Sequence, residues 1–306
     1  MNGNLNTDNR PMKTIKITTG IALALTCSLA ATLKAQNIYV SNYGNGAIGE
    51  YGLDGSVVNA SLITGLTTPE GIAISGNNMF VVNQGTGTIG EYGLDGSVVN
   101  ASLITGLSTP TGIAISGDYL FVSSAPNYGG YVGEYTTSGA TVNASLITGL
   151  SGAGGLAISE NDLFVANRYG GTVGEYTTSG ATVNASLISG LAWPSGLAIS
   201  GSELFVANEV GNTVGKYTTS GAVINASLTS TGFEPFYMAV SGDDLFVACW
   251  DGTVGEYTTS GATVNPELIS GLSNAYAIAI SPVPEPSTIA LAALGVVTLC
   301  LRRQRK

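Results

Sequence analysis

The stretch Thr172-Val173-Gly174-Glu175-Tyr176 is one copy of a motif that recurs along the chain at nearly constant intervals. Its last three residues, Gly-Glu-Tyr, also begin at positions 49, 90, 133 and 255, and Gly215-Lys216-Tyr217 stands at the one remaining place. The successive spacings are 41, 43, 41, 41 and 40 residues. Internal similarity at a period of this length is typical of propellers, solenoids and other repeat architectures.

Between these marks each unit repeats four short segments, of the types Gly-Ile-Ala-Ile-Ser, Leu-Phe-Val-Ala-Asn, Thr-Val-Gly-Glu-Tyr and Ala-Ser-Leu-Ile-Thr. Each segment is rich in β-branched or aromatic residues and is bounded by Gly, Asn, Asp or Ser, which is the pattern of short strands. Four strands in about 40 residues predict one blade of a β-propeller. We therefore predict an all-β fold, a six-bladed β-propeller of four-stranded blades.

The two ends of the repeat region predict how the ring closes. The region begins at residues 38–40 with a segment of the second type and ends at residues 277–281 with one of the first type. The C-terminal strand should therefore complete the first blade and hide the sheet edges that an open array exposes. The propeller is expected to span residues 36–282.

A representative unit carries a family resemblance. Residues 108–116 read Ser-Thr-Pro-Thr-Gly-Ile-Ala-Ile-Ser, and Leu120-Phe121-Val122 follow after a short polar turn. This order resembles the NHL-repeat propellers, and the resemblance covers residues 37–281. It implies a fold rather than a function, since one fold serves many functions.

The repeats differ most in the loops between second and third strands and in those that lead into the first strands. In a propeller both sets open on the same rim, where aromatic faces with nearby amides and carboxylates suit sugar rings or peptides. The alternative is that these side chains only plug the channel. The candidate ligand-binding residues are Tyr43, Glu70, Arg168, Tyr169, Trp193, Glu209, Phe236, Tyr237, Trp250 and Asp251.

Residues that recur in every unit are better explained by blade geometry. Lys216 replaces the glutamate of Gly-Glu-Tyr in one unit, so a ring of metal-binding carboxylates is not expected there. Asn42, Asn83, Asn167 and Asn208 follow the second strand in four units, where asparagine side chains often bond the turn backbone.

Composition excludes several functions. The chain of 306 residues contains no histidine, which removes imidazole bases, histidine-ligated zinc and Ser/His/Asp triads. Between residues 36 and 282 the only cations are Arg168 and Lys216, against 18 carboxylates, which gives a net charge near −16. Nucleic acid is therefore excluded as a partner. No calcium-loop spacing is present, and no metal or cofactor is expected.

The N-terminus predicts export. Residues 12–16 read Met-Lys-Thr-Ile-Lys, and a largely apolar run reaches residue 31 before the small residue Ala35. This order is that of a secretory signal peptide, with cleavage predicted after Ala35 and Met12 as a possible start of translation. Residues 1–35 are therefore assigned to the signal.

The C-terminal segment, residues 283–306, contains Pro284-Glu285-Pro286, thirteen uncharged residues from 289 to 301, and a basic end that includes Arg302 and Arg303. The apolar stretch is shorter than the roughly 20 residues of a stable spanning helix, which predicts transient membrane anchoring. The order resembles the PEP-CTERM sorting signal. That resemblance implies an exosortase, a membrane-embedded protease or transpeptidase, as a partner that cuts near Pro284-Glu285-Pro286 and releases the protein to the cell surface or extracellular matrix.

Three functions remain open. The first is a non-enzymatic propeller that binds a matrix polysaccharide or a surface protein through the variable rim. The second is a metal-dependent lactonase or esterase of the gluconolactonase type, whose metal set Glu70, Asn167 and Asn208 would imitate. The third is a passive structural or adhesive protein of the matrix. We expect no enzymatic activity, because no candidate base stands apart from the repeat.

Overall fold

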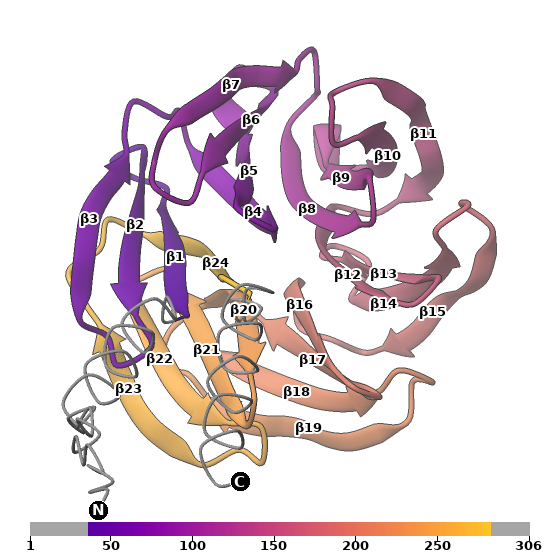
Figure 1. Ribbon diagram of the computed structural model, residues 1–306. Coiled ribbons are helices and arrows are strands. Elements are labelled where there is room, and N and C mark those ends of the chain that lie inside the picture. Colours follow the sequence, from indigo (N-terminus) through magenta and orange to yellow (C-terminus); the bar gives the residue numbers. More distant parts are fainter. Residues whose placement is uncertain (1–35, 283–306) are drawn as a thin grey trace, which may run out of the picture. The chain divides into compact units, whose positions relative to one another are not determined.

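In the computed structural model, which describes residues 36–282, six antiparallel sheets are arranged around a common axis (Figure 1). The predicted signal peptide and sorting tail lie outside the described residues. No helix in the described part is long and apolar enough to cross a membrane.

The six sheets are the predicted blades, labelled A to F here. Blade A consists of β24 (Ala275–Ile280), β1 (Asn37–Asn42), β2 (Ala47–Gly52) and β3 (Val57–Ile63). Blade B consists of β4 (Pro69–Ser75), β5 (Asn78–Asn83), β6 (Thr88–Gly93) and β7 (Val98–Ile104). Blade C consists of β8 (Pro110–Ser116), β9 (Tyr119–Ser124), β10 (Gly130–Thr136) and β11 (Thr141–Leu150).

Blade D consists of β12 (Ala153–Ser159), β13 (Asp162–Asn167), β14 (Thr172–Thr177) and β15 (Thr182–Ser189). Blade E consists of β16 (Pro194–Ser200), β17 (Glu203–Asn208), β18 (Thr213–Thr218) and β19 (Val223–Ser230). Blade F consists of β20 (Pro235–Ser241), β21 (Asp244–Cys249), β22 (Thr253–Thr258) and β23 (Thr263–Ile269). Two short 3-10 turns lie at Gln84–Thr86 and Pro126–Tyr128.

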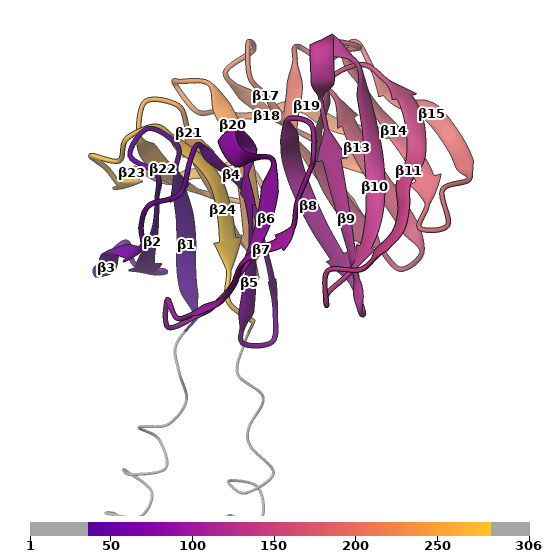
Figure 2. The same cartoon turned by 90° about the horizontal axis from the view of Figure 1, so that it is seen from above.

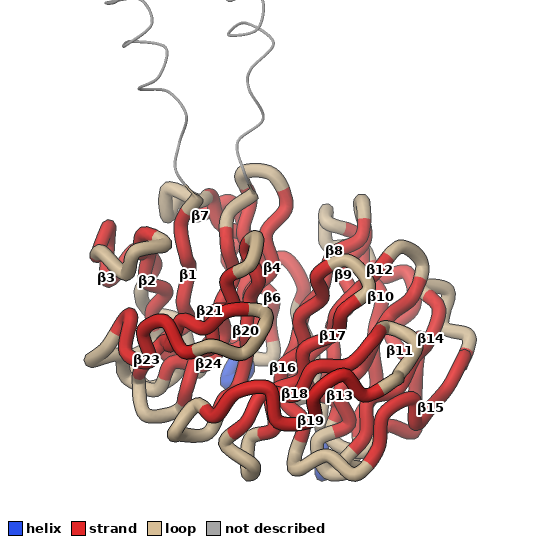
Figure 3. The backbone as a smooth tube through the Cα atoms, turned by 90° about the horizontal axis from the view of Figure 1, so that it is seen from below, coloured by secondary structure: helices blue, strands red, loops and turns tan. Residues whose placement is uncertain are grey.

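Within every blade the strands pair in order from the channel outward, and the innermost strands β24, β4, β8, β12, β16 and β20 contact one another around the axis. The strands run between two rims at which the loops gather (Figures 2 and 3). One rim, the mouth rim, carries the loops from second to third strands and those into the first strands. The other, the terminal rim, carries the hairpins between first and second strands and also Gln36 and Pro282, the ends of the described chain.

The ring closes as predicted. Strand β1 pairs with both β2 and β24, so the last strand of the propeller becomes the innermost strand of blade A. Beyond the ladder, the Asn37 amide donates to Ser281 Oγ at 2.8 Å, and the Ser281 amide donates to the Asn37 carbonyl at 2.9 Å. These bonds hold the two ends of the domain together without a disulfide, and Cys249, the cysteine in the described part, is buried and free.

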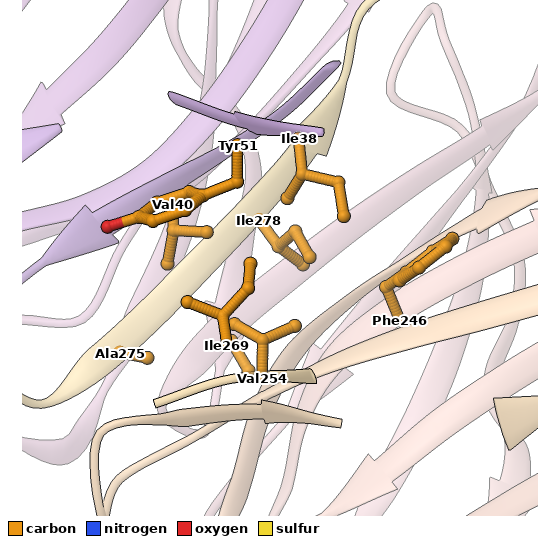
Figure 4. Close-up of a cluster of buried hydrophobic side chains, with 9 residues drawn as sticks. Ile38, Val40, Tyr51, Phe246, Val254, Ile269, Ala275 and Ile278 are labelled. Carbon is orange, nitrogen blue, oxygen red and sulfur yellow. The ribbon is translucent and has the colours of Figure 1, made fainter. Parts of the chain in front are cut away.

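Apolar side chains from adjacent blades form the core. Between blades A and F, Ile38 and Val40 of β1 and Ile278 of β24 lie against Phe246 and Val254 of blade F (Figure 4). The phenylalanine of the second strand is fully buried in five blades, at Phe80, Phe121, Phe164, Phe205 and Phe246. The repeat therefore buries one large ring in most interfaces between blades, and such rings contribute strongly to core stability.

The glutamate of Gly-Glu-Tyr makes contacts within its own blade. Glu50 is buried, and its Oε1 accepts hydrogen bonds from Asn37 Nδ2 at 2.6 Å and from the Tyr39 hydroxyl at 3.1 Å. At the equivalent place, Lys216 Nζ lies 2.8 Å from Glu203 Oε2 and donates to the Thr259 carbonyl at 3.0 Å. This position serves blade structure, as its repetition predicts.

Candidate functional site

Two rings of non-repeating residues surround the channel at the mouth rim. The outer ring follows the second strands, and the inner ring is formed by the second residue of each first strand. Around the ring from blade A to blade F, the outer residues are Tyr43, Gln84, Ala125, Arg168, Glu209 and Trp250. In the same order, the inner residues are Tyr276, Glu70, Thr111, Gly154, Ser195 and Phe236.

A β-bulge presents each inner-ring residue to the mouth. In blade B the pairing of β4 with β5 shifts by one residue between Pro69 and Ile72, and the same shift recurs in the first strand of every blade. A bulge leaves one residue out of the ladder and re-aims its side chain. Glu70 therefore belongs to a strand rather than to the loop before it, and the bulge turns it toward the channel.

Below the inner ring, glycine permits the close approach of the first strands. A Cβ on Gly196 would lie 2.3 Å from the Phe236 carbonyl oxygen, and one on Gly155 would lie 2.5 Å from the Ser195 carbonyl oxygen. Blade F departs from this rule with Tyr237. Its hydroxyl lies 3.1 Å from the place that a Cβ on Gly112 of blade C would take, so Tyr237 spans the channel beneath the mouth.

Above Tyr237 the mouth is a cavity of about 470 Å³. Its walls are formed by the outer ring, by four residues of the inner ring and by three further loop residues, in all Tyr43, Glu70, Gln84, Thr109, Thr111, Ala125, Arg168, Tyr169, Glu209, Glu234, Phe236, Trp250 and Tyr276. Small side chains in blades C and D leave room opposite large ones in blades F and A. The mouth is therefore asymmetric, with an aromatic side and a polar side.

The aromatic side is one continuous cluster, called the aromatic patch here and formed by Tyr43, Phe236, Trp250 and Tyr276. The ring centroids of Phe236 and Tyr276 lie 4.5 Å apart, and Trp250 lies 5.3 Å from Phe236 and 5.5 Å from Tyr43. Mutual packing limits the motion of these rings. The patch is thus a preorganised surface on which a ligand ring can stack at low entropic cost.

The polar side begins with Glu70, which is 2% exposed. Its Oε1 accepts a hydrogen bond from Gln84 Nε2 at 2.5 Å, whereas Oε2 has no hydrogen-bond partner among residues 36–282. Burial raises the pKa of Glu70 well above its usual range, and the nearby Arg168 charge and Tyr276 hydroxyl oppose this shift only in part. A carboxyl in this state keeps its proton to a higher pH than an exposed glutamate does.

Arg168 and Glu209, in adjacent blades, form an ion pair at the margin of the mouth. The guanidinium carbon also lies 5.0 Å from the Trp193 ring centroid, 5.7 Å from that of Tyr169 and 5.9 Å from that of Phe236. Burial raises the pKa of Glu209, and the bond from Arg168 opposes that rise. Arg168 Nε and Glu209 Oε2 are buried without a partner in the described part of the chain.

The structure gathers seven of the ten predicted residues at the mouth, namely Tyr43, Glu70, Arg168, Tyr169, Glu209, Phe236 and Trp250. Trp193, 43% exposed, flanks the mouth and packs edge-on against Tyr169. Tyr237 lies below it. Asp251 lies apart, because its Oδ1 accepts bonds from the backbone amide and the hydroxyl of Thr253 and so shapes the turn.

Six residues that line the mouth are not among the predicted site residues, namely Gln84, Thr109, Thr111, Ala125, Glu234 and Tyr276. Their signal is variation at a fixed place in the repeat, and comparing all six units at the second position of the first strand finds Thr111 and Tyr276 at once. The same comparison at the position after the second strand finds Gln84.

The asparagines of the lactonase hypothesis do not line the mouth with Glu70. Asn167 and Asn208 end buried strands, and Asn167 Nδ2 donates to the Thr172 hydroxyl at 3.3 Å. Asn42 Oδ1 accepts from the Ser273 amide at 3.3 Å, in the loop that leads into β24 rather than in its own turn. Within residues 36–282, no group of three or more Cys, Asp or Glu side chains is placed to hold a metal ion.

Residues 282–306 match the PEP-CTERM protein-sorting motif. The chain carries a PEP-CTERM sorting signal. This signal implies processing by an exosortase and marks the protein for export and for sorting to the surface or beyond it. The match confirms the prediction made from the Pro-Glu-Pro, apolar and basic segments of the tail.

Comparison with solved structures supports the fold. The chain is similar to a chain in the crystal structure of a nidogen/laminin complex, with a TM-score of 0.68 and 18% sequence identity over 82% of this chain and 100% of that one. A computationally designed protein, Ika8, matches with a TM-score of 0.48 and 16% identity over 79% of this chain and 74% of its own. No curated protein matches the sequence.

Proposed function

We propose that this exported propeller is a non-catalytic binding module that holds a polysaccharide of the extracellular matrix in its mouth. The observation that carries the proposal is the aromatic patch beside buried polar atoms that lack partners. A sugar ring has one or two apolar faces and a polar edge of hydroxyls. The patch fits such a face, while Glu70 Oε2, Glu209 Oε2 and Arg168 Nε would bond the edge.

The plug interpretation accounts for Tyr237 but not for the residues above it. Tyr237 spans the channel, so the rings of the aromatic patch are not needed to close it. A buried polar atom without a partner costs free energy, and the three residues that carry such atoms here, Glu70, Arg168 and Glu209, line one cavity. These atoms favour a ligand that supplies the missing bonds over a passive filler.

The position of the chain ends suits display on a surface. First strands such as β24 run from the mouth rim to the terminal rim, so the described chain leaves the propeller at Pro282 on the rim opposite the mouth.

The direct test is retention of the purified domain on exopolysaccharide from the host. A matched pair of variants places the site, because Ala125 lines the mouth and Ser202 is exposed in a hairpin of the terminal rim. We expect Ala125→Trp to fill the mouth and abolish binding to the exopolysaccharide, whereas the Ser202→Trp variant should bind like the parent protein. Loss of retention in both variants, or in neither, would refute the mouth as the site.

The same assay separates the remaining alternatives. A parent protein that no matrix fraction retains would overturn the binding function and favour the passive structural role. Hydrolysis of lactones or esters by the purified domain, lost in Glu70→Gln, would overturn the non-catalytic assignment.

A further inference from the structure

Glu70 is a buried acid with one carboxyl oxygen, Oε2, that lacks a hydrogen-bond partner in the described part of the chain. Its side chain is almost fully enclosed, and Gln84 satisfies only Oε1. Thr111, the neighbouring inner-ring residue, is by contrast fully engaged, since its hydroxyl lies 2.8 Å from the Ala153 carbonyl oxygen and 2.9 Å from Ser123 Oγ. Glu70 Oε2 therefore differs from the Thr111 hydroxyl, because it has no hydrogen-bond partner within the inner ring.

Neither cation of the described domain forms an ion pair with Glu70. Arg168 is paired with Glu209, and Lys216 is paired with Glu203 in blade E. A buried carboxylate is stable as an anion only when it is paired and hydrogen-bonded. Glu70 therefore lacks the positive partner that would let it ionise in the closed ring.

Two residues of the aromatic patch, Tyr43 and Tyr276, line the mouth together with Glu70. The charge of Glu70 raises the pKa of both hydroxyls, although burial is the larger cause, and the Tyr276 hydroxyl in turn lowers the pKa of Glu70. They come from separate elements, the loop after β1 and strand β24. A cation between a carboxylate and aromatic rings gains from both.

The charge of the mouth disfavours anions. Of its three carboxyl groups, Glu209 is paired with Arg168, Glu70 keeps its proton to a higher pH than usual, and Glu234 forms no ion pair among residues 36–282. The domain as a whole carries a net charge near −16 between residues 36 and 282. A polysaccharide rich in carboxylates or sulfates would be repelled, whereas a cationic one would be drawn toward the mouth.

We propose that the mouth selects sugar units that bear a free, protonated amino group, with the ammonium bonded to Glu70 Oε2 and the sugar ring stacked on the aromatic patch. The ligand class is therefore a polysaccharide that contains unacetylated amino sugars. This inference rests on the proposed function and adds the chemical class of the ligand. An N-acetylated sugar would fit the patch but could not neutralise Glu70.

Binding of the ammonium group should release a proton from Glu70. In the free protein the raised pKa of Glu70 keeps the carboxyl protonated to a higher pH than usual, and an ammonium beside it would favour the carboxylate. The groups that act on Glu70 are Arg168 and the hydroxyls of Tyr43, Tyr237 and Tyr276, while Glu209 and Glu234 line the same mouth, and Gln84 and Thr111 beside it are neutral. Affinity should rise with pH through the pKa of Glu70 and fall again where the ligand amine loses its proton.

The experiment measures binding of two oligosaccharides of equal length by titration calorimetry, glucosamine oligomers and N-acetylglucosamine oligomers. We expect the glucosamine oligomer to bind about tenfold more tightly or better, since a charge-assisted bond replaces an unmet acceptor. Titrations in buffers of different ionisation enthalpy should show proton release with the glucosamine oligomer alone.

The decisive variant is Glu70→Gln, which keeps the size of the side chain and its bond with Gln84 but removes the charge. We expect it to reduce the preference for glucosamine oligomers to about onefold and to abolish proton release. Asp118→Asn removes an equal charge at an exposed position on the terminal rim, so it should keep the preference. Thermal unfolding of both variants verifies folding.

Each other outcome is informative. Equal binding of the two oligomers would overturn the amino-sugar inference and leave the polysaccharide function standing, and an unchanged preference in Glu70→Gln would do the same. If a blocked lysine amide binds as tightly as the glucosamine oligomer, the proposal of a sugar ligand would be overturned and a protein ligand favoured. Failure of every oligosaccharide and of the host exopolysaccharide to bind would overturn both proposals.

Discussion

Asn37 and Ser281, 244 positions apart in the sequence, are joined by two hydrogen bonds that tie the first strand of the propeller to the end of the last. Around this pair the apolar side chains Ile38 and Ile278 pack on opposite strands of blade A (Figure 4). A ring closed in this way has no open interface between its first and last blades, so its stability depends on a strand at the far end of the chain.

We predict that a chain ending at Ser273, which lacks β24, loses about 5 kcal/mol or more of unfolding free energy. Strand β24 buries Ala275, Ala277 and Ile278, and each large aliphatic side chain contributes roughly 1.5–3 kcal/mol besides the lost ladder. Thermal unfolding measures the effect. The matched control ends at Pro282 and should unfold like the full domain, and equal melting temperatures for the two chains would contradict the closure.

The two tryptophans should differ in what they contribute. Trp193 is 43% exposed and stands over the Arg168 guanidinium, so Trp193→Ala should cost about 1 kcal/mol or less, the value of one cation–π contact. Trp250 packs inside the aromatic patch, so Trp250→Ala should cost about 2 kcal/mol, less than a full core truncation.

Retention on exopolysaccharide completes the test of these two variants. If the mouth binds a glycan, both alanine variants should weaken retention. Trp193→Ala should do so without a matching loss of stability, because Trp193 is exposed. Weakened retention that follows the melting temperature alone would mean that the rings act only through folding.

Glu70 should make the free domain less stable as pH rises. Its folded pKa lies above the unfolded value, so the folded state binds more protons between the two values. Stability from this group is complete below the unfolded pKa and is lost as pH rises through the folded pKa. Glu70→Gln should therefore raise the melting temperature at pH 8 and change it little at pH 4, and an equal change at both pH values would contradict this role of Glu70.

The exported protein should lack both predicted processing segments. We expect the intact mass of protein recovered from the cell surface or medium to exclude residues 1–35 and the chain from about residue 289 onward, since each end carries a processing signal. Mature protein that retains the complete tail would contradict cleavage by an exosortase, and mature protein that retains residues 1–35 would contradict the signal peptide.

The sequence located many residues of the site but did not predict how they lie relative to one another. Variation within the repeat led to the mouth-rim loops and to seven of the residues that line the cavity. It did not show that Glu70 lies in a bulged strand. A one-residue shift in strand pairing cannot be recognised from the alternation of apolar and polar residues in so short a segment. Nor did it separate Asp251, whose carboxylate is used by its own turn, from its neighbours in the loops.

The repeat alone predicts the blade, the number of blades and the closing strand, because these follow from a period of about 40 residues and from local strand patterns that every unit repeats. Which unrepeated residues meet depends on the folded ring. Arg168 and Glu209 pair across two blades, and Tyr237 reaches from blade F to Gly112 of blade C. Such contacts depend on how the ring brings separate loops together in space, and that placement is set by packing around the axis rather than by any local pattern.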